Sequence, residues 1–438
     1  MGKFLQIKEF DTIISDTCTK QVPDNVHKIS DSDFTLLKKF IHDFSPNDGD
    51  FVITEFVNQS FDVRYGDTIK CKNYVGLIQL KSGFQIEILP KIYKGDNDIV
   101  VKNIFIKMLR TLRDFPSKVF SDANLNTSKM HLYEIFINMY IQEVIQLTKI
   151  GLKSNYSNIE DNQNFYKGKL LFNEHIIKNL AHKEKFYIVY DEFNLDRPEN
   201  RIIKSTLLKL KKITLDFNNS SEINRLLMYF ENVKESSNYD SDFSKISITR
   251  VNKEYENSII WAKVFLKNKS FTTFSGENSA RALLFPMETI FESYIANKLK
   301  KAVDSNDWNV AIQAKELYLF DEPRKFRLKP DIVIRSKIDN RCIILDTKWK
   351  NLIDNPSKNY GISQSDMYQM YAYSKKYKTA PVIWLIYPLN QAMEKYKDAQ
   401  LSFVASENDD NVTVRVFFVD LTNIEDSINS LKNNALIK

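Results

Sequence analysis

The clearest alternation of hydrophobic and polar residues lies in FRLKPDIVIRSKIDNRCIILDTKWK, residues 326–350. Its period of two predicts one strand from Asp331 to Ser336 and a second from Arg341 to Trp349. The mostly polar segment 337–340 predicts the turn between them. The second strand is apolar until it reaches Asp346, Thr347 and Lys348, so its charged residues stand at the end of a buried run.

Successive side chains of a strand point to opposite faces, so Asp346 and Lys348 are expected on one face and Thr347 on the other. If the two strands pair as a hairpin, Asp331 comes close to Asp346. Two carboxylates and an ammonium suit phosphodiester hydrolysis, in which oxygen ligands hold Mg²⁺ or Mn²⁺. Asp331, Asp346 and the Thr347 backbone carbonyl would bind the metal. Lys348 would orient or deprotonate the attacking water and stabilise negative charge. The alternative is a surface hairpin whose charges are only solvated.

The elements around this hairpin follow an α-β-β-β-α-β order. The apolar spacing predicts helices over 287–301 and 365–376, and strands over 310–320, 326–335, 341–349 and 382–387. With the PD…DxK pattern, this order resembles the PD-(D/E)xK nuclease superfamily. The resemblance implies an α/β fold (α+β over the whole chain) whose core is a restriction-endonuclease-like mixed sheet.

Two further groups of residues follow from that resemblance. The first helix of the superfamily often carries a glutamate that supports the metal site, and here Glu292 is preferred to Glu288. On the second helix, Gln369 and Tyr373 share a face and resemble the Gln-x-x-x-Tyr element of the RecB-like branch. The alternatives are exposed helix acids for the glutamates and ordinary helix packing for the Gln–Tyr pair. Nearby cations could form a phosphate-contacting rim or only a solvated face; they are Arg324, Lys325, Arg327, Lys329, Arg335 and Arg341.

The chain before residue 270 predicts two regions. Alternating runs such as YVGLIQL (74–80) and FQIEILP (84–90) predict a small hairpin-rich β domain, after an irregular or partly helical start over 1–45. Helical spacing then dominates, interrupted by a polar, Asn-rich segment at 153–166 that is expected to be a loop. We therefore expect a β-rich domain over 1–95, a mainly helical region over 96–270 and a nuclease domain over 271–438.

The composition of the chain limits the kinds of site and partner that it is expected to have. The net charge of +6 is a mild lean toward anionic partners. Three scattered cysteines without metal-binding spacing indicate a reducing, cytoplasmic compartment, and no apolar run is long enough for a membrane. No histidine follows His182, which excludes His-metal sites and histidine triads from the C-terminal part. No G-x-x-x-x-G-K-[ST] loop occurs, so the chain shows no nucleotide site of its own.

Several segments resemble the McrC family, the nuclease subunit of McrBC-type modification-dependent restriction systems. They appear in the family's order and are YVGLIQLKSGFQIEILPKI (74–92), YDEFNLDRPENRIIK (190–204), LLFPMETIFESY (283–294) and the pair PDIVI and ILDTKWK. The resemblance implies a McrB-like AAA+ GTPase ring as partner, with GTP bound by that partner. It also implies double-stranded DNA carrying a modified base, usually 5-methylcytosine, as substrate.

The resemblance further assigns partner docking to the β-rich domain over 1–95 together with the helical segments up to residue 270. It assigns stimulation of GTP hydrolysis to the same part of the chain, and cutting to the C-terminal part. Two other functions stay open. A stand-alone PD-(D/E)xK repair or recombination nuclease would cut with Mg²⁺ and without GTP. A non-catalytic adaptor would keep the fold and only bridge an AAA+ ring to DNA, which the intact Asp331, Asp346 and Lys348 argue against.

Overall fold

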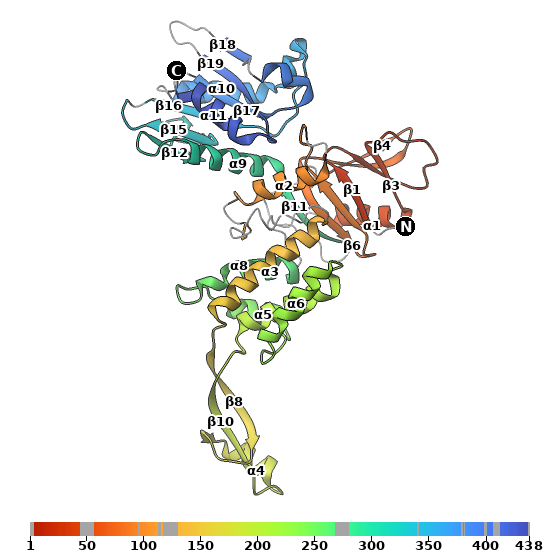
Figure 1. Ribbon diagram of the computed structural model, residues 1–438, viewed down its shortest axis with the longest axis vertical. Coiled ribbons are helices and arrows are strands. Elements are labelled where there is room, and N and C mark those ends of the chain that lie inside the picture. The colour runs from red at the N-terminus through yellow and green to blue at the C-terminus, as the bar shows by residue number, and fades with distance from the viewer. Residues whose placement is uncertain are drawn as a thin grey trace. The chain divides into compact units, whose positions relative to one another are not determined.

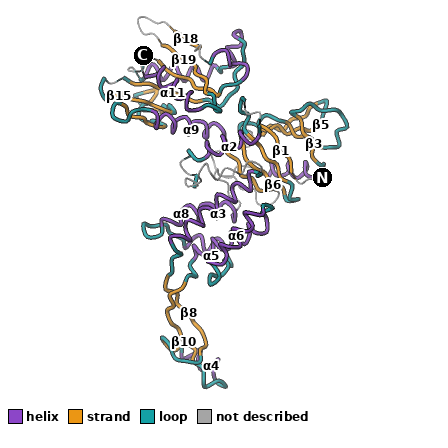
Figure 2. The backbone as a smooth tube through the Cα atoms, in the orientation of Figure 1, coloured by secondary structure: helices purple, strands orange, loops and turns teal. Residues whose placement is uncertain are grey.

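The structure is a computed structural model of the 438-residue chain. It describes residues 4–43, 57–94, 97–112, 115–116, 130–267, 280–339, 341–377, 380, 382–397, 401–405 and 412–436. Residues 1–115 and 270–438 together form one compact unit, and residues 116–269 form another (Figure 1). Both units mix helices and strands, as expected for an α+β protein (Figure 2). The division into three domains at residues 95 and 270 stays a prediction.

The N-terminal part of the first unit contributes most of two four-stranded sheets, of order β1-β7-β6-β11 and β3-β2-β5-β4. Their strands are β1 (Phe4–Lys8), β2 (Thr12–Ser15), β3 (Val26–Ile29), β4 (Val57–Asp62), β5 (Gly66–Cys71), β6 (Tyr74–Leu80), β7 (Gln85–Leu89) and β11 (Ala280–Pro286). The helices are α1 (Asp31–Asp43) and α2 (Asp98–Leu109). The strands predicted over 74–80 and 84–90 are confirmed. The irregular or partly helical start predicted over 1–45 is correct in part: α1 is the helix, but three short strands precede it, and two of them, β1 and β2, pair with strands far along the chain.

Strand β11 joins the N-terminal sheet to the C-terminal part, because it pairs with β6 and leads directly into α9 (Met287–Ala302). Gly76, in the middle of β6, permits this pairing. Its φ is +136°, and a Cβ atom at this position would lie 2.0 Å from the backbone oxygen of Leu283. Only glycine tolerates both the backbone angle and the close approach. The expected entrance to the nuclease domain, 271–282, lies mostly outside the described residues.

The C-terminal part is built on a six-stranded mixed sheet of order β12-β15-β16-β17-β19-β18. Its strands are β12 (Trp308–Ile312), β15 (Ile332–Ser336), β16 (Cys342–Thr347), β17 (Val382–Pro388), β18 (Leu401–Ala405) and β19 (Val412–Val419). A separate two-stranded sheet pairs β13 (Tyr318–Phe320) with β14 (Lys325–Arg327). The strands predicted over 310–320 and 326–335 are therefore each divided. Gln313 takes a φ of +50° and directs the chain out of the large sheet.

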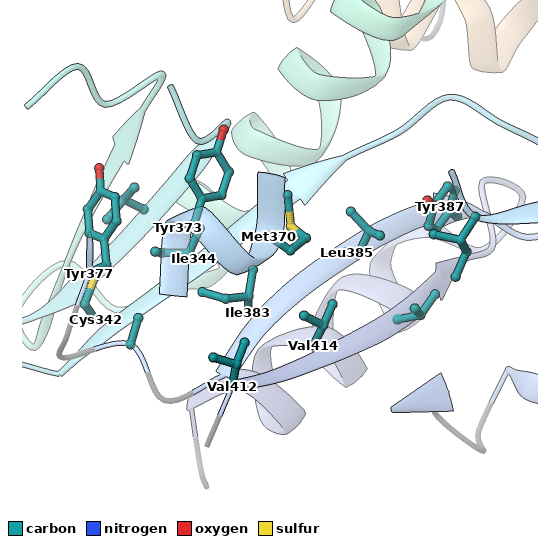
Figure 3. Close-up of a cluster of buried hydrophobic side chains, with 14 of the residues drawn as sticks. Cys342, Ile344, Met370, Tyr373, Tyr377, Ile383, Leu385, Tyr387, Val412 and Val414 are labelled. Atoms are coloured by element: carbon teal, nitrogen blue, oxygen red, sulfur yellow. The ribbon is translucent and has the colours of Figure 1, made fainter. Parts of the chain in front are cut away.

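Helices cover both faces of this sheet. Besides α9, they are α10 (Gln364–Lys376) and α11 (Ile424–Leu436), with short 3-10 turns η4 (Pro356–Gly361) and η5 (Gln391–Tyr396). Met370 and Tyr373 of α10 pack on Ile344, Ile383 and Leu385 (Figure 3). Residues 342, 344 and 346 share one face of β16, so Asp346 points to the side of α10. Every residue of β16 is buried, because the strand has neighbours on both edges and both faces.

The second unit has a helical body and a long arm built on a three-stranded antiparallel sheet. The helices are α3 (Leu132–Ile150), α4 (Phe172–Asn179), α5 (Pro198–Ile213), α6 (Phe217–Tyr229), α7 (Tyr239–Lys245) and α8 (Glu256–Lys267), with the turn η3 (Lys253–Tyr255) before α8. Buried aromatic side chains such as Trp261 and Tyr140 fill the body. Within the described ranges, no helix has the length and apolar character that a bilayer crossing requires.

The arm consists of β8 (Asn155–Gln163), β9 (Lys169–Leu170) and β10 (Phe186–Asn194), with α4 at its far end (Figure 1). Strands β8 and β10 pair antiparallel over nine residues each. The loop predicted at 153–166 is therefore wrong. A strand with solvent on both faces has no apolar stripe, so the periodicity of its sequence gives no strand signal.

Candidate active site

The β15–β16 hairpin brings the predicted carboxylates together. Ile332 stands opposite Leu345 in the ladder, so the next position toward the open end brings Asp331 to the level of Asp346. The backbone N–H and the hydroxyl of Thr347 both donate to Oδ2 of Asp331, at 2.7 Å each. Burial raises the pKa of Asp331, and these two hydrogen bonds oppose the rise. The end of β16 thus holds Asp331 in one position.

Asp346 is the most desolvated member of the group, with a relative exposure of 0%. The ammonium of Lys348 lies 2.5 Å from its Oδ2. Apart from this ammonium, no donor among the described residues reaches either carboxylate oxygen. Burial, and after it the charge of Asp331, raise the pKa of Asp346 to about 7, while Lys348 lowers it. With Lys348 as its one described partner, this buried carboxylate favours a further cation or a proton beside its remaining oxygen.

Glu292, on α9, belongs to the same electrostatic group. Burial and the charges of Asp331 and Asp346 raise its pKa to about 7, against a hydrogen bond from Gln313 and the charge of Lys348. Glu288, one turn earlier, is exposed and accepts a hydrogen bond from Asn73 at 3.1 Å. Glu292, the preferred glutamate, is therefore the one that interacts electrostatically with Asp331 and Asp346.

A chain of hydrogen bonds runs from Lys348 to α10. The Lys348 ammonium donates to Oε1 of Gln369 at 3.2 Å, and Nε2 of Gln369 donates to the Tyr373 hydroxyl at 2.6 Å. The ring of Tyr373 packs in the hydrophobic core, and its hydroxyl points away from the neighbouring aliphatic side chains (Figure 3). The predicted Gln–Tyr pair therefore does more than pack, since it orients the amide that receives the lysine.

The lysine itself is held in its charged form. Burial disfavours the ammonium of Lys348, but the nearby charges of Asp346 and Asp331 outweigh burial and raise its pKa above the ordinary value. Asp366, in the first turn of α10, adds to this effect. The sequence reasoning did not include Asp366, and no spacing in the chain singles it out.

The donor set suits a hard divalent cation, because it offers carboxylate oxygens and no thiolate or imidazole. The buried oxygens of Asp346, whose one described partner is Lys348, are the observation that supports this fit. Among the residues that the structure describes, no three His, Cys, Asp or Glu side chains already stand as a metal-binding cluster. The residues that could hold such a cation are Asp331, Asp346 and Thr347, with Glu292 beside them.

A residue that the sequence reasoning missed holds the segment after Lys348. The indole N–H of Trp349 donates to the carboxylate of Glu9, at 3.0 Å from Oε1 and 3.2 Å from Oε2, and the backbone N–H of Lys91 donates to Oε2 at 3.1 Å. The Trp349 ring also packs on Phe291 of α9, with ring centroids 5.4 Å apart. Glu9 and Trp349 are 340 residues apart, and no local pattern predicts their contact.

The buried carboxyl of Glu9 leads to a prediction about how the free energy of unfolding depends on pH. Its burial raises the carboxyl pKa from an ordinary 4.5 to about 8. The folded chain therefore keeps a proton between these values that the unfolded chain releases, so stability falls as pH rises from 4.5 to 8. Glu9→Gln, which mimics the protonated acid, is expected to stabilise the chain by roughly 3–5 kcal/mol above pH 8 and little below pH 4.5. Urea unfolding at pH 5 and pH 8.5 measures this difference.

The exposed Glu322→Gln serves as control, with the same small effect at both pH values. If the gain from Glu9→Gln were equal at pH 5 and pH 8.5, the buried carboxyl would not titrate as described.

The basic rim expected around the site is largely engaged elsewhere. Arg335 pairs with Glu316, Arg341 with Asp339, and Arg327 donates to the hydroxyl of Tyr318. These pairs lie on β13, β14 and the far end of the hairpin. They favour the solvated-face alternative for these three arginines.

Comparisons with known proteins agree with this architecture. A model of the family described as McrBC 5-methylcytosine restriction system component matches residues 69–388. One solved structure with a TM-score of 0.67 is the refined half-complex from a tetradecameric assembly of Thermococcus gammatolerans McrB AAA+ hexamers with bound McrC. It has 20% identity over 98% of this chain and 99% of that chain, and shows a shared fold.

A second solved structure, the cryo-EM structure of the Thermococcus gammatolerans McrBC complex, has a TM-score of 0.47 and 21% identity over 69% of this chain and 88% of that chain. No curated protein matches the chain. The family match spans well over half of the residues and includes strands β6 and β7 and the hairpin with Asp331, Asp346 and Lys348. The chain therefore belongs to the McrBC 5-methylcytosine restriction system component family.

Proposed function

We propose that the chain is the DNA endonuclease subunit of a McrBC-like, GTP-dependent and modification-dependent restriction complex. The observation that carries this proposal is the buried Asp346, which meets Asp331 and Lys348 at the end of one strand with Lys348 as its one described partner. Burying charges in this way costs folding free energy, so such groups are found mainly where a function requires them. Phosphodiester hydrolysis uses such a set of groups.

The order of elements supports a PD-(D/E)xK core. Helix α9 is followed by β12, β15 and β16, then α10 and β17, which is the α-β-β-β-α-β order expected for that superfamily. The catalytic hairpin occupies the middle of the sheet, and the helices that flank it carry Glu292 and Gln369. The candidate residues therefore lie in, or directly beside, four elements: α9, β15, β16 and α10.

The cofactor of this proposal is Mg²⁺, with Mn²⁺ accepted by the same oxygens. Asp331, Asp346 and the backbone carbonyl of Thr347 would hold it, with Glu292 in support. When bound, such an ion neutralises charge on the phosphate and favours an attacking hydroxide. The chain's own part is to place Lys348 beside the scissile phosphate, where its ammonium stabilises negative charge, and to fix Lys348 through Gln369 and Tyr373.

The partner in this proposal is a McrB-like AAA+ GTPase ring, which binds GTP and selects DNA with a modified base, 5-methylcytosine in the family description. The similar Thermococcus gammatolerans chain is bound to McrB AAA+ hexamers. The second unit, at 116–269, is the part we assign to docking, in line with the role expected for the chain before residue 270.

The arm of that unit supports the docking role. Its far end exposes large apolar side chains that a protein surface ordinarily covers; they are Phe165, Tyr166, Phe172, Ile176, Ile177 and Leu180. Exposed apolar side chains gathered at one end of an element favour a protein–protein contact. Three of the six, Phe172, Ile176 and Ile177, belong to α4, and the arm can carry them into a partner.

Reconstitution tests the proposal. The purified chain alone is expected to cut methylated duplex DNA at least about a hundredfold more slowly than the chain mixed with its AAA+ partner, GTP and Mg²⁺. The reason is that the active site is expected to engage DNA only in the assembled complex. Chelation of the divalent ion should stop cutting without stopping association of the two proteins. Gel analysis of DNA products and size-exclusion chromatography measure both. Rapid cutting by the chain and Mg²⁺ alone would instead identify a stand-alone nuclease.

A further inference from the structure

A cleft of about 550 Å³ opens beside the candidate active site, and its walls come from both ends of the chain. Lys348 and the residues that follow it line one side. Residues from the N-terminal sheets line another. The lining residues are Phe10, Asn73, Lys91, Glu288, Lys348, Trp349, Lys350, Asn351 and Asp366. The N-terminal part therefore borders the space from which a substrate reaches Lys348.

The charges of this cleft leave one cation available. Glu288 already accepts a hydrogen bond from Asn73, and Asp366 lies 3.9 Å from the ammonium of Lys350. Lys348 is paired with Asp346. Lys91 is exposed, and within the described residues its ammonium forms no ion pair, although its charge acts on the buried carboxyl of Glu9. An anion that enters the cleft can meet this ammonium without displacing a partner.

One buried side chain ties the backbone at Lys91 to the segment that follows Lys348. The carboxyl group of Glu9 accepts hydrogen bonds both from the backbone N–H of Lys91 and from the indole of Trp349, the residue after Lys348. Both lysines line the same cleft. Two ammonium groups in one cleft suit a ligand with several negative charges, such as a sugar-phosphate chain.

Phe10 adds an aromatic surface to the same wall. It lies in the turn closed by the N–H of Asp11 and the carbonyl of Lys8, at 3.1 Å, and has a φ of +68°. This left-handed backbone favours glycine and is strained for a phenylalanine. Residues kept in such conformations concentrate at binding sites, and an aromatic ring can stack on a base or pack on a sugar.

We propose that this cleft binds the DNA strand next to the bond that is cut, with Lys91 on a phosphate and Phe10 against the adjoining nucleotide. The inference rests on the proposed nuclease function and extends it, since it assigns substrate binding to the N-terminal part. Lys91 and Phe10 are substrate-binding residues here, and Glu9 is the positioning residue that links their wall to Lys348.

The test compares Lys91→Ala with Lys81→Ala in the full chain assembled with its AAA+ partner. Lys81 is exposed and stands at the opposite end of the β6–β7 hairpin. Loss of one phosphate contact is expected to raise the KM for DNA roughly eightfold at 0.1 M salt, since each contact contributes about 0.9 to the slope of log affinity against log salt. The ratio to the unsubstituted chain should shrink as salt rises. The kcat should stay within about twofold, and Lys91→Arg should restore the KM.

A second variant tests the cleft by a change that is not expected to unfold the chain. Phe10→Gly removes the ring and relieves the backbone, so the fold is expected to persist while KM rises about tenfold through lost stacking. Unchanged KM for both Lys91→Ala and Phe10→Gly would overturn the inference. So would a loss of GTPase stimulation by Lys91→Ala with DNA KM unchanged, since the cleft would then bind the partner protein.

These outcomes are separable from failure of the proposed function. That function fails when Asp346→Ala cuts as fast as the unsubstituted chain, whatever Lys91 does. The inference alone fails when Asp346→Ala is inactive and the Lys91 and Phe10 variants keep both their KM and its salt dependence.

Discussion

Replacement of Asp346 by alanine is expected to lower DNA cleavage by the assembled complex at least roughly a thousandfold, while the variant still stimulates its partner's GTPase. Asp346 offers two fully buried oxygens next to Asp331 and Lys348. Removing it takes away charge from the point where the cation would be held, and a loss of about 4 kcal/mol in transition-state stabilisation corresponds to that factor. Cleavage of methylated plasmid and GTP hydrolysis, measured on the same assembly, separate the two effects.

Asp339→Asn is the matched control, because this carboxylate is exposed and sits in the turn of the same hairpin. It should cut at the normal rate. An adaptor without catalytic function would show full activity with Asp346→Ala as well, because its DNA cutting would come from another protein. Urea unfolding of Asp346→Asn at pH 8 checks the fold: the midpoint is expected at or above that of the unsubstituted chain, since the buried carboxylate no longer has to ionise.

Charged substitutions at the end of the arm are expected to separate the chain from its partner. In Ile177→Asp with Leu180→Asp, two exposed apolar side chains of the α4 region become carboxylates. Burial of each at an interface contributes about 1.5–3 kcal/mol, so the loss of both should weaken association by roughly a hundredfold or more. GTPase stimulation should fall with association. Titration of the partner's GTPase with the variant gives both values.

The fold of the variant is not at risk, because the side chain of Ile177 is 74% exposed and that of Leu180 is 79% exposed. Leu215→Asp is the control. This side chain is 92% exposed in the same unit but belongs to the connection between α5 and α6, not to the arm. Equal weakening by Leu215→Asp would show that the effect comes from added charge, and normal association of the double variant would remove the arm from the docking surface.

The local hydrophobic pattern was sufficient to predict the β15–β16 hairpin and the helices α9 and α10. The alternation over 326–350 predicts two strands, found as β15 and β16, and helical spacing predicts α9 and α10 to within one residue at each end. These elements are well predicted because each buries one or both faces in the core, and burial imposes its period on the sequence. Strand β8 was missed for the converse reason, since it is paired along its edge but has no buried face to impose a pattern.

The environment of the candidate residues could not be predicted in this way. The sequence by itself determined which groups are the candidates for the chemistry, Asp331, Asp346 and Lys348, and that two of them stand at the end of one apolar run. Only the tertiary structure decided that Asp346 has Lys348 as its one described partner, that Gln369 receives Lys348, and that Glu9 and Lys91 reach this site from the other end of the chain. Burial and long-range hydrogen bonds depend on residues hundreds of positions away, and local periodicity carries no record of such neighbours.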